Sequence, residues 1–247
     1  MMYNYKNSKA NIINILKSKT PIEHKKTIPL SDSEFTFENG IETFVSAIFI
    51  DIKNSSDLFA TRDEKLARLL RAFTGEIITI FQGDNNYRQI GIRGDCVYGI
   101  YTTPNKKDVV SVFDIAIMTN TFMKMFNELL KQNHYITIGA GIGLGCDKEL
   151  IIKAGRSGTG INDKIWIGEA VVDASNLASI AKRHGFQNIA MDSCFYNNII
   201  EAKKKENSKY SQWIQKVNSE NKYFEKEFYH CNIVRTEFDN WIKEGMK

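Results

Sequence analysis

The chain of 247 residues is long enough to bury one sizeable core, so we expect one domain with or without short extensions. Hydrophobic residues make up 43% of it and charged residues 25%, as in soluble globular proteins. Its net charge of +4 argues against a nucleic-acid partner, and no apolar run approaches the roughly 18 residues of a membrane span.

The amino-terminal residues and the cysteines indicate the compartment. Residues 1–20 are too polar for the hydrophobic stretch of a signal peptide. The cysteines are widely separated and form no CxxC pair, so we expect reduced thiols in a cytoplasmic protein. They are Cys96, Cys146, Cys194 and Cys231.

The first third of the chain predicts a helix, an irregular arm, a buried strand and a second helix. Residues 1–40 hold two of the three prolines, and we expect the arm there to pack on the domain or on a partner subunit. Residues 44–50 are almost entirely apolar or small, which is typical of a strand buried on both faces. Apolar residues recur at helical spacing over residues 61–82, where Thr61 and Glu64 have the pattern of a capping box.

The middle of the chain predicts hairpins alternating with helices. A hairpin is expected over residues 87–101, with its turn at Arg93-Gly94-Asp95. The elements expected after it are a long amphipathic helix over residues 108–132, two glycine-rich strands within residues 135–155, a helix over residues 168–185 with Gly185 as C-cap, and a short strand at residues 188–192.

This order of elements predicts an α+β fold, with helices on one side of a mainly antiparallel sheet. We divide the chain into an arm at residues 1–40, a catalytic domain at 41–194 and a carboxy-terminal extension at 195–247. The extension starts with a lysine-rich stretch that predicts a solvated helix, and it ends with a strand and a closing helix.

Two carboxylates mark the candidate site. Asp51 ends the first buried strand, and Asp95 lies at the tip of the following hairpin. If those elements are neighbours in the sheet, the carboxylates converge at one edge, and hard oxygen ligands without histidine or cysteine suit Mg²⁺ or Mn²⁺. Taken singly, Asp51 could instead be a helix N-cap and Asp95 a turn residue.

The residues after Asp51 favour a phosphate-binding role. They lead from the strand toward a helix, and backbone N–H groups at such a junction bind anions. The polar side chains of Asn54, Ser55 and Ser56 add hydrogen-bonding groups there.

Three blocks of sequence follow one another at characteristic distances. They are Phe49-x-Asp51-Ile52-x-x-Ser55-Ser56, the pair Gly94-Asp95, and WIGEAVVDASNLAS at residues 166–179. Their order and spacing, over about residues 44–192, resemble the class III nucleotide cyclase family.

The resemblance implies a ferredoxin-like fold that works as a homodimer, with active sites at the subunit interface. It implies two Mn²⁺ or Mg²⁺ ions per site, held by Asp51, Asp95 and the Ile52 carbonyl. It also implies a nucleoside triphosphate substrate held by the 52–56 loop, with Phe49, Arg93 and Gly94 among the substrate-binding residues. The 3′-hydroxyl of the ribose would attack the α-phosphate, and pyrophosphate would leave.

Four positions depart from the usual family pattern. Gly91 stands where adenylate cyclases usually have a lysine that reads adenine, and Ile165 stands at the second purine-reading position. Val172 and Asn176 stand where the helix usually offers an asparagine and a basic residue. We retain Asn176 as a candidate catalytic residue, and Arg156 or Arg93 as the source of the missing positive charge.

These departures make the resemblance closest to the pyrimidine cyclases of bacterial Pycsar antiphage systems. Such enzymes make cyclic UMP or cyclic CMP, which activates a separate effector. UTP is therefore the favoured substrate and CTP the next. The alternatives are an adenylate or guanylate cyclase, a degenerate module that only binds nucleotide, and a diguanylate-cyclase or polymerase-palm relative, whose GGDEF-like run is absent.

Overall fold

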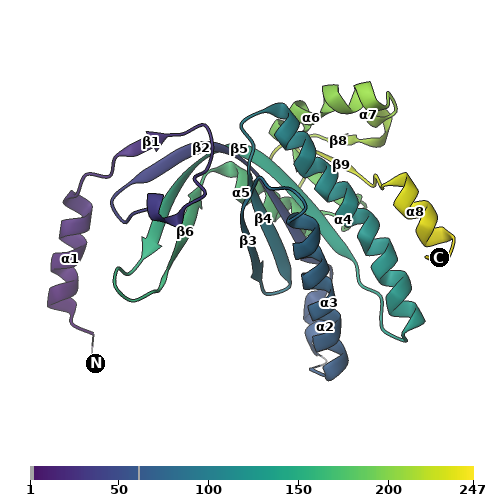
Figure 1. Ribbon diagram of the computed structural model, residues 1–247, viewed down its shortest axis with the longest axis horizontal. Coiled ribbons are helices and arrows are strands. Elements are labelled where there is room, and N and C mark those ends of the chain that lie inside the picture. Colours follow the sequence, from purple (N-terminus) through teal and green to yellow (C-terminus); the bar gives the residue numbers. More distant parts are fainter. Residues whose placement is uncertain (1–2, 61) are drawn as a thin grey trace.

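The computed structural model describes residues 3–60 and 62–247 of the chain (Figure 1). Its helices and strands follow one another in this order: α1 (Tyr5–Lys17), β1 (Ile22–His24), β2 (Gly40–Ile52), α2 (Ser55–Ala60), α3 (Glu64–Phe81), β3 (Tyr87–Arg93), β4 (Cys96–Thr102), α4 (Lys106–Gln132), β5 (Ala140–Gly155), β6 (Asn162–Ile167), α5 (Glu169–Ile180), β7 (Ile189–Asp192), α6 (Ser193–Glu206), α7 (Tyr210–Trp213), β8 (Gln215–Val217), β9 (Phe228–Cys231) and α8 (Thr236–Lys243).

All the strands form one sheet, whose main path runs β3-β4-β2-β5-β7-β9-β8. β1 pairs with β2 and β6 pairs with β5, outside this path. Among the strands of the described residues, only the β1–β2 and β5–β7 pairings are parallel, which confirms the predicted α+β fold with a mainly antiparallel sheet. The tail contributes β8 and β9, so it extends the sheet of the central domain.

The helices cover both faces of the sheet, and the prediction of helices on one side only was wrong. Even-numbered residues of β2, such as Ile48 and Ile50, pack in the main core with Phe73 of α3 and Phe113 of α4. Odd-numbered residues of β2 point the other way, and Phe49 packs against α5. Figure 1 shows α3 and α4 on the near side of the sheet and α5 behind it.

β5 is a single strand of 16 residues, where the sequence predicted two strands separated by glycines. The glycines have a packing role instead. A Cβ on Gly141, Gly143 or Gly145 would overlap carbonyl oxygens of Ala178, Ala174 and Ala170 on α5. The absence of side chains at every second position therefore lets α5 lie directly on the backbone of β5.

The long helix α4 is a core helix. It is apolar and long enough for a membrane span by composition alone, but two thirds of its most apolar window is buried inside the protein. Its buried side chains include Val109, Phe113, Phe122 and Phe126. The adjacent helix α3 begins after Asp63, whose carboxylate accepts the Leu66 N–H at 2.7 Å, whereas Thr61 of the expected capping box lies outside the described residues.

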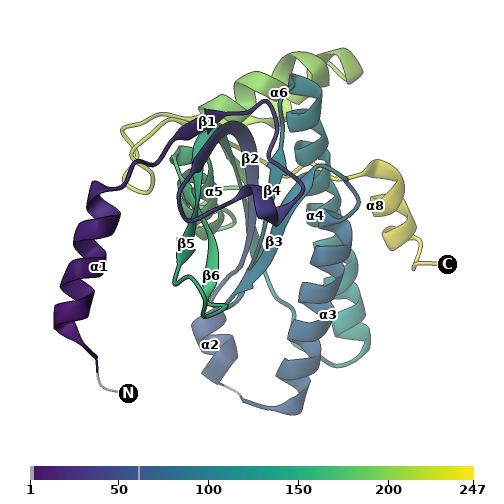
Figure 2. The same cartoon turned by 60° about the vertical axis from the view of Figure 1, so that its left-hand side comes forward.

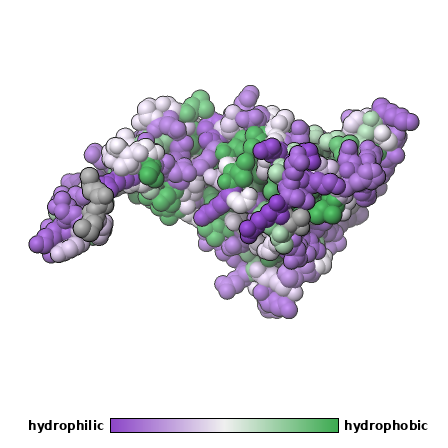
Figure 3. All heavy atoms as spheres, turned by 90° about the horizontal axis from the view of Figure 1, so that it is seen from below, coloured by the Kyte–Doolittle hydropathy of each residue, from purple (hydrophilic) through white to green (hydrophobic). Residues whose placement is uncertain are grey.

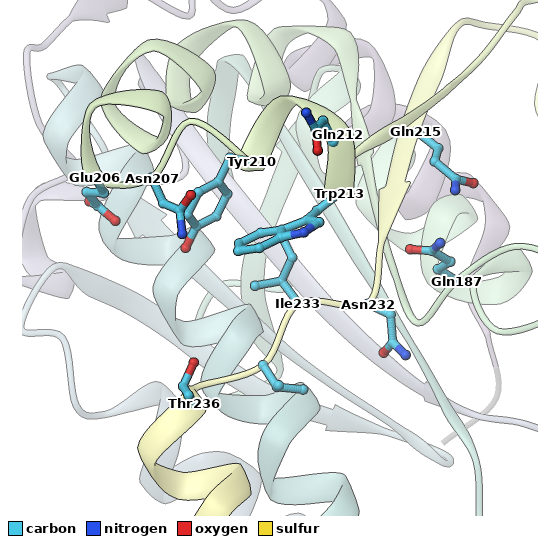
Figure 4. A pocket seen from close by; sticks show the side chains of 11 residues that line it. Gln187, Glu206, Asn207, Tyr210, Gln212, Trp213, Gln215, Asn232, Ile233 and Thr236 are labelled. Atoms are coloured by element: carbon cyan, nitrogen blue, oxygen red, sulfur yellow. The ribbon is translucent and has the colours of Figure 1, made fainter.

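The arm and the tail differ in how they meet the body. α1 has no buried residue and stands apart from the sheet in both ribbon views (Figures 1 and 2), while Ile28 and Phe35 farther along the arm are buried. In the tail, α6 is less solvated than expected, because Lys203 is 2% exposed and donates to Asp114 at 2.8 Å. A cavity of about 620 Å³ lies between α7 and the segment after β9, with Trp213 and Ile233 in its wall (Figure 4).

Candidate active site

The two carboxylates singled out by the sequence lie at the same edge of the sheet. Asp51 is the register partner of Cys96 in the β2–β4 ladder, and Asp95 is the residue before Cys96 in the β3–β4 turn. Gly94, at φ +64°, supplies the left-handed conformation that this two-residue turn needs. The hairpin thus brings Asp95 back beside the end of β2.

The titration behaviour of the neighbouring groups reflects this convergence. Burial raises the pKa of Asp51 above its ordinary value, and the nearby charge of Asp95 raises it further, while Arg183 opposes both effects. Burial together with the charges of both carboxylates raises the pKa of the Cys96 thiol to about 12. The edge therefore concentrates negative potential, which favours a bound cation and keeps Cys96 protonated.

The positively charged side chain of Arg183 contacts two of the expected metal ligands, Asp51 and the Ile52 carbonyl. The Arg183 guanidinium donates to Asp51 Oδ2 at 2.8 Å and to the Ile52 carbonyl at 3.1 Å. The same carboxylate and carbonyl were expected to hold a divalent ion, and this geometry shows that both can accept from one positive group. These oxygen atoms are therefore suited to bind a hard cation such as Mg²⁺ or Mn²⁺. Sequence reasoning missed Arg183, because it lies 132 residues from Asp51.

The loop after Asp51 turns sharply into α2. Asn54 adopts a left-handed conformation at φ +57°, and its carbonyl accepts from the N–H groups of Asp57 and Leu58. Ser55 and Ser56 occupy the first positions of α2, with Ser55 half-buried and Ser56 exposed. The expected strand-to-helix junction is thus present directly after Asp51.

Aromatic side chains fill the space beside Gly91. The ring of Tyr98 lies where any side chain at position 91 would go, because a Cβ there would be 2.5 Å from the Tyr98 Cζ. Tyr98 stacks on Phe49, with ring centroids 5.2 Å apart, and its hydroxyl accepts from the Gln89 amide at 3.1 Å. Gln89 in turn accepts from the Trp166 indole of β6 at 2.8 Å. A longer side chain at position 91 would have to displace the Tyr98 ring.

The remaining candidates are spread over the molecule. Arg93 is exposed at the end of β3, next to the Gly94-Asp95 turn. Asn176 and Val172 are exposed on α5. Arg156 lies beyond the far end of β5, roughly 45 Å along that strand from the residue that pairs with Asp51. Within one chain, Arg156 is therefore remote from the carboxylates.

A second cluster of metal-ligand types lies away from this edge. One ligand atom each of Cys146, Asp192 and Cys194 lies within 4.8 Å of the others. Asp192 already accepts the N–H groups of Cys146 and of Phe195 at the start of α6. Burial also raises the pKa of the Cys146 thiol, which disfavours the thiolate a metal needs. We therefore assign this cluster to the packing of α6 on β5.

Comparison with known proteins relates this arrangement to nucleotide cyclases. The chain is 40% identical over its whole length to a uridylate cyclase from Treponema porcinum, of which it covers 83%. The chain belongs to the uridylate cyclase family. A second member, from Gulbenkiania mobilis, is 30% identical over 98% of the chain and 97% of its own length. No family model matches the sequence.

Solved structures show the wider relationship of the uridylate cyclase fold. The adenylyl cyclase CyaB from P. aeruginosa superposes with a TM-score of 0.63 at 20% identity, over 80% of this chain and 97% of that one. The guanylyl cyclase Cya2 superposes with a TM-score of 0.61 at 11% identity, over 80% of this chain and 95% of that one. The fold expected from the resemblance is therefore confirmed.

Proposed function

We propose that the protein converts a pyrimidine nucleoside triphosphate, UTP in preference to CTP, into the 3′,5′-cyclic monophosphate and pyrophosphate. The observation that carries the chemistry is the convergence of Asp51 and Asp95 on one sheet edge, beside the Ile52 carbonyl. In this assignment the three groups hold two Mg²⁺ or Mn²⁺ ions. Bound there, the ions would neutralise the triphosphate and lower the pKa of the ribose 3′-hydroxyl.

The residues of the chain divide the remaining work. The phosphate oxygens accept hydrogen bonds from N–H groups of the 52–56 loop and from the side chains of Asn54, Ser55 and Ser56. The ribose oxygen bonds to the α-phosphorus as the bond to pyrophosphate breaks, and the hydroxyl proton passes to solvent. Arg93, at the end of β3, is close to Asp95 in the chain and supplies positive charge next to the leaving group.

The preference for a pyrimidine is supported by Tyr98. Its ring occupies the space over Gly91 and stacks on Phe49, so less room is left for a base beside these residues. Ile165, at the second purine-reading position, carries no hydrogen-bonding group in its side chain. A site that recognises the edge of a purine does so with polar side chains that hydrogen-bond to the base, because a hydrogen bond left unmade changes the discrimination between bases by orders of magnitude. A single-ring base suits this wall better than a purine.

A homodimer belongs to the same proposal. Large apolar side chains on β3, on β6 and the loop before it, and on α5 are between 47% and 76% exposed; they are Ile92, Ile161, Ile165, Ile167 and Val172. Figure 3, a view from below, shows hydrophobic side chains grouped among hydrophilic ones. A second copy that covers some of these exposed apolar side chains would bring its own Arg156 and Asn176 to the site. The cyclic product would act on a separate effector in antiphage defence, in a cytoplasmic setting.

A panel of nucleotides tests the function. Purified protein with Mn²⁺ is incubated separately with ATP, GTP, CTP and UTP, and the products are identified by mass. We expect cyclic UMP as the main product, and none from the Asp51→Ala variant. The exposed Glu225→Gln variant is the control and should match the wild type. Cyclisation of ATP or GTP alone would refute the pyrimidine assignment, and pyrophosphate release equal in all variants would refute the enzymatic one.

A further inference from the structure

Arg183 is held in place by four oxygen acceptors. Its Nη2 lies 2.8 Å from Asp51 Oδ2 and 3.1 Å from the Ile52 carbonyl, and its Nη1 lies 3.1 Å from the Ala178 carbonyl and 3.3 Å from the Ala181 carbonyl. The side chain is only 17% exposed. One edge of the guanidinium therefore rests on the end of α5, and the other covers the proposed metal ligands.

The backbone around Arg183 is built for this placement. After α5, Lys182 at φ +59° and His184 at φ +56° both adopt the left-handed conformation, followed by Gly185 at φ +87°. Such conformations are unfavourable for residues with side chains, and they persist where the surroundings impose them. The turn is closed by the Phe186 N–H, which donates to the Arg183 carbonyl at 2.9 Å. Two unfavourable residues thus flank the arginine that reaches Asp51.

The carbonyl groups at the end of α5 explain why a cation is stable there. The last carbonyls of a helix lack partners within the helix and carry partial negative charge, which favours a nearby arginine. Asp51 adds a full negative charge on the opposite side. The guanidinium is therefore satisfied from both sides without any ligand.

We propose that Arg183 is a resident counter-ion of the nucleotide-free site and competes with one of the two divalent ions. This inference rests on the proposed function, since it concerns the same ligands. A divalent ion that used the Ile52 carbonyl together with Asp51 Oδ2 would meet the guanidinium at both atoms, and like charges cannot share them closely. In the part of the chain that the structure describes, no side chain bonds to Asp95 or to the other oxygen of Asp51, which leaves them to the first ion. The second ion binds only when the guanidinium turns away, toward the phosphates of an arriving triphosphate.

Titration of Mn²⁺ into the nucleotide-free protein tests the competition. Bound and free Mn²⁺ are separated by electron paramagnetic resonance, so no turnover is needed. We expect the wild type to bind one ion per chain well and a second one weakly. The Arg183→Met variant, which keeps the length of the stem and loses the charge, should bind the second ion about tenfold more tightly or better.

The Lys182→Met variant is the matched control. It removes the same charge from the neighbouring residue, whose ammonium has no hydrogen bond to Asp51 or Ile52 in the described part of the chain. The general loss of positive field is screened by salt, and we expect it to change the affinity for the second ion much less, by about twofold. An equal effect of the two variants, or no effect of Arg183→Met, would overturn the proposal.

Two further measurements keep the outcome clear. Circular dichroism verifies the fold, and if Arg183→Met is unfolded, Arg183→Gln replaces it, since its amide can still donate to the Ala178 carbonyl. The nucleotide panel is run on the same preparations. A protein that cyclises no triphosphate refutes the proposed function while the Mn²⁺ result still decides the role of Arg183. If the protein is active but Arg183→Met binds the second Mn²⁺ no more tightly than the wild type, only the counter-ion role of Arg183 is refuted.

Discussion

Replacing Gly143 by alanine should loosen α5 from the sheet. The added Cβ would overlap the Ala174 carbonyl oxygen and the Ala178 backbone nitrogen, so it meets backbone that cannot rotate aside. A real Cβ essentially never comes within 3.0 Å of such atoms, and α5 must therefore move outward by about one ångström. A gap of that size removes a quarter to a half of the dispersion energy of each contact it opens.

The cost of this shift can be placed on a temperature scale. Overpacking a well-filled interior typically costs about 1–3 kcal/mol, and contact with rigid backbone puts this site in the upper part of that range, at about 2–3 kcal/mol. In a chain of this size each kcal/mol lowers the melting temperature by about 2–4 °C. We therefore expect Gly143→Ala to melt about 4–12 °C below the wild type, as followed by circular dichroism.

Gly75 provides the matched control. It lies exposed within α3, and a Cβ there would meet nothing within 4 Å. Alanine is a better helix former than glycine by about 0.5–1 kcal/mol, so Gly75→Ala should melt slightly above the wild type. If Gly143→Ala melts within a degree of the wild type, α5 does not rest on the backbone of β5 as described.

Three further changes test the site and its surroundings. Asp95→Asn should lower cyclisation more than about a hundredfold, because a proposed metal ligand is lost, with an unchanged melting temperature since Asp95 lies half-exposed in a turn; near-normal turnover would contradict this. Tyr98→Ala should raise the ratio of purine to pyrimidine product roughly tenfold, by opening the space over Gly91, and an unchanged ratio by mass spectrometry would exclude Tyr98 as the selective group. Burial raises the pKa of Glu149 from its ordinary value of 4.5 to about 7 in the folded chain, so the protein should lose stability as the pH rises toward 7, where only the unfolded chain has this carboxyl ionised, and should lose no more from it above 7. Between pH 5.5 and pH 7 the melting temperature of Glu149→Gln should fall less steeply than that of the wild type, with Asp192, whose pKa burial also raises to about 7, keeping part of the slope; equal slopes for both proteins would contradict that origin.

The elements that carry the carboxylates could be predicted because their signals are local. The apolar run before Asp51 and the Gly94-Asp95 turn each identify a strand end from a few adjacent residues. Their meeting depends on the pairing of β2 with β4, which the sequence analysis had to assume. The face on which α5 lies was a different matter, because the alternation of Gly141, Gly143 and Gly145 was interpreted as an interruption between strands. Glycine at every second position instead indicates one continuous strand that has no side chains on the face toward α5.

The sequence analysis missed Arg183 and Tyr98 for different physical reasons. A contact between Arg183 and Asp51 joins segments 132 residues apart, and no periodicity encodes such a contact. The available signal was weak: an arginine in the short turn between the end of a helix and Gly185. The filling of the Gly91 position by Tyr98 depends on the register of β3 and β4, in which the two residues are partners. Register across a hairpin is fixed by its turn, so this pairing was accessible in principle.

The pairing of β9 with β7 has a practical consequence for anyone who trims the chain. β7 joins the sheet along β5, and β9 completes the hydrogen bonding of its other side from Ile189 to Asp192. A fragment cut after residue 194 would present that side as a bare, apolar ladder of amides, which is the kind of edge that recruits other chains into aggregates. The tail therefore protects an edge of the catalytic sheet from pairing with other chains, and a minimal cyclase should include it.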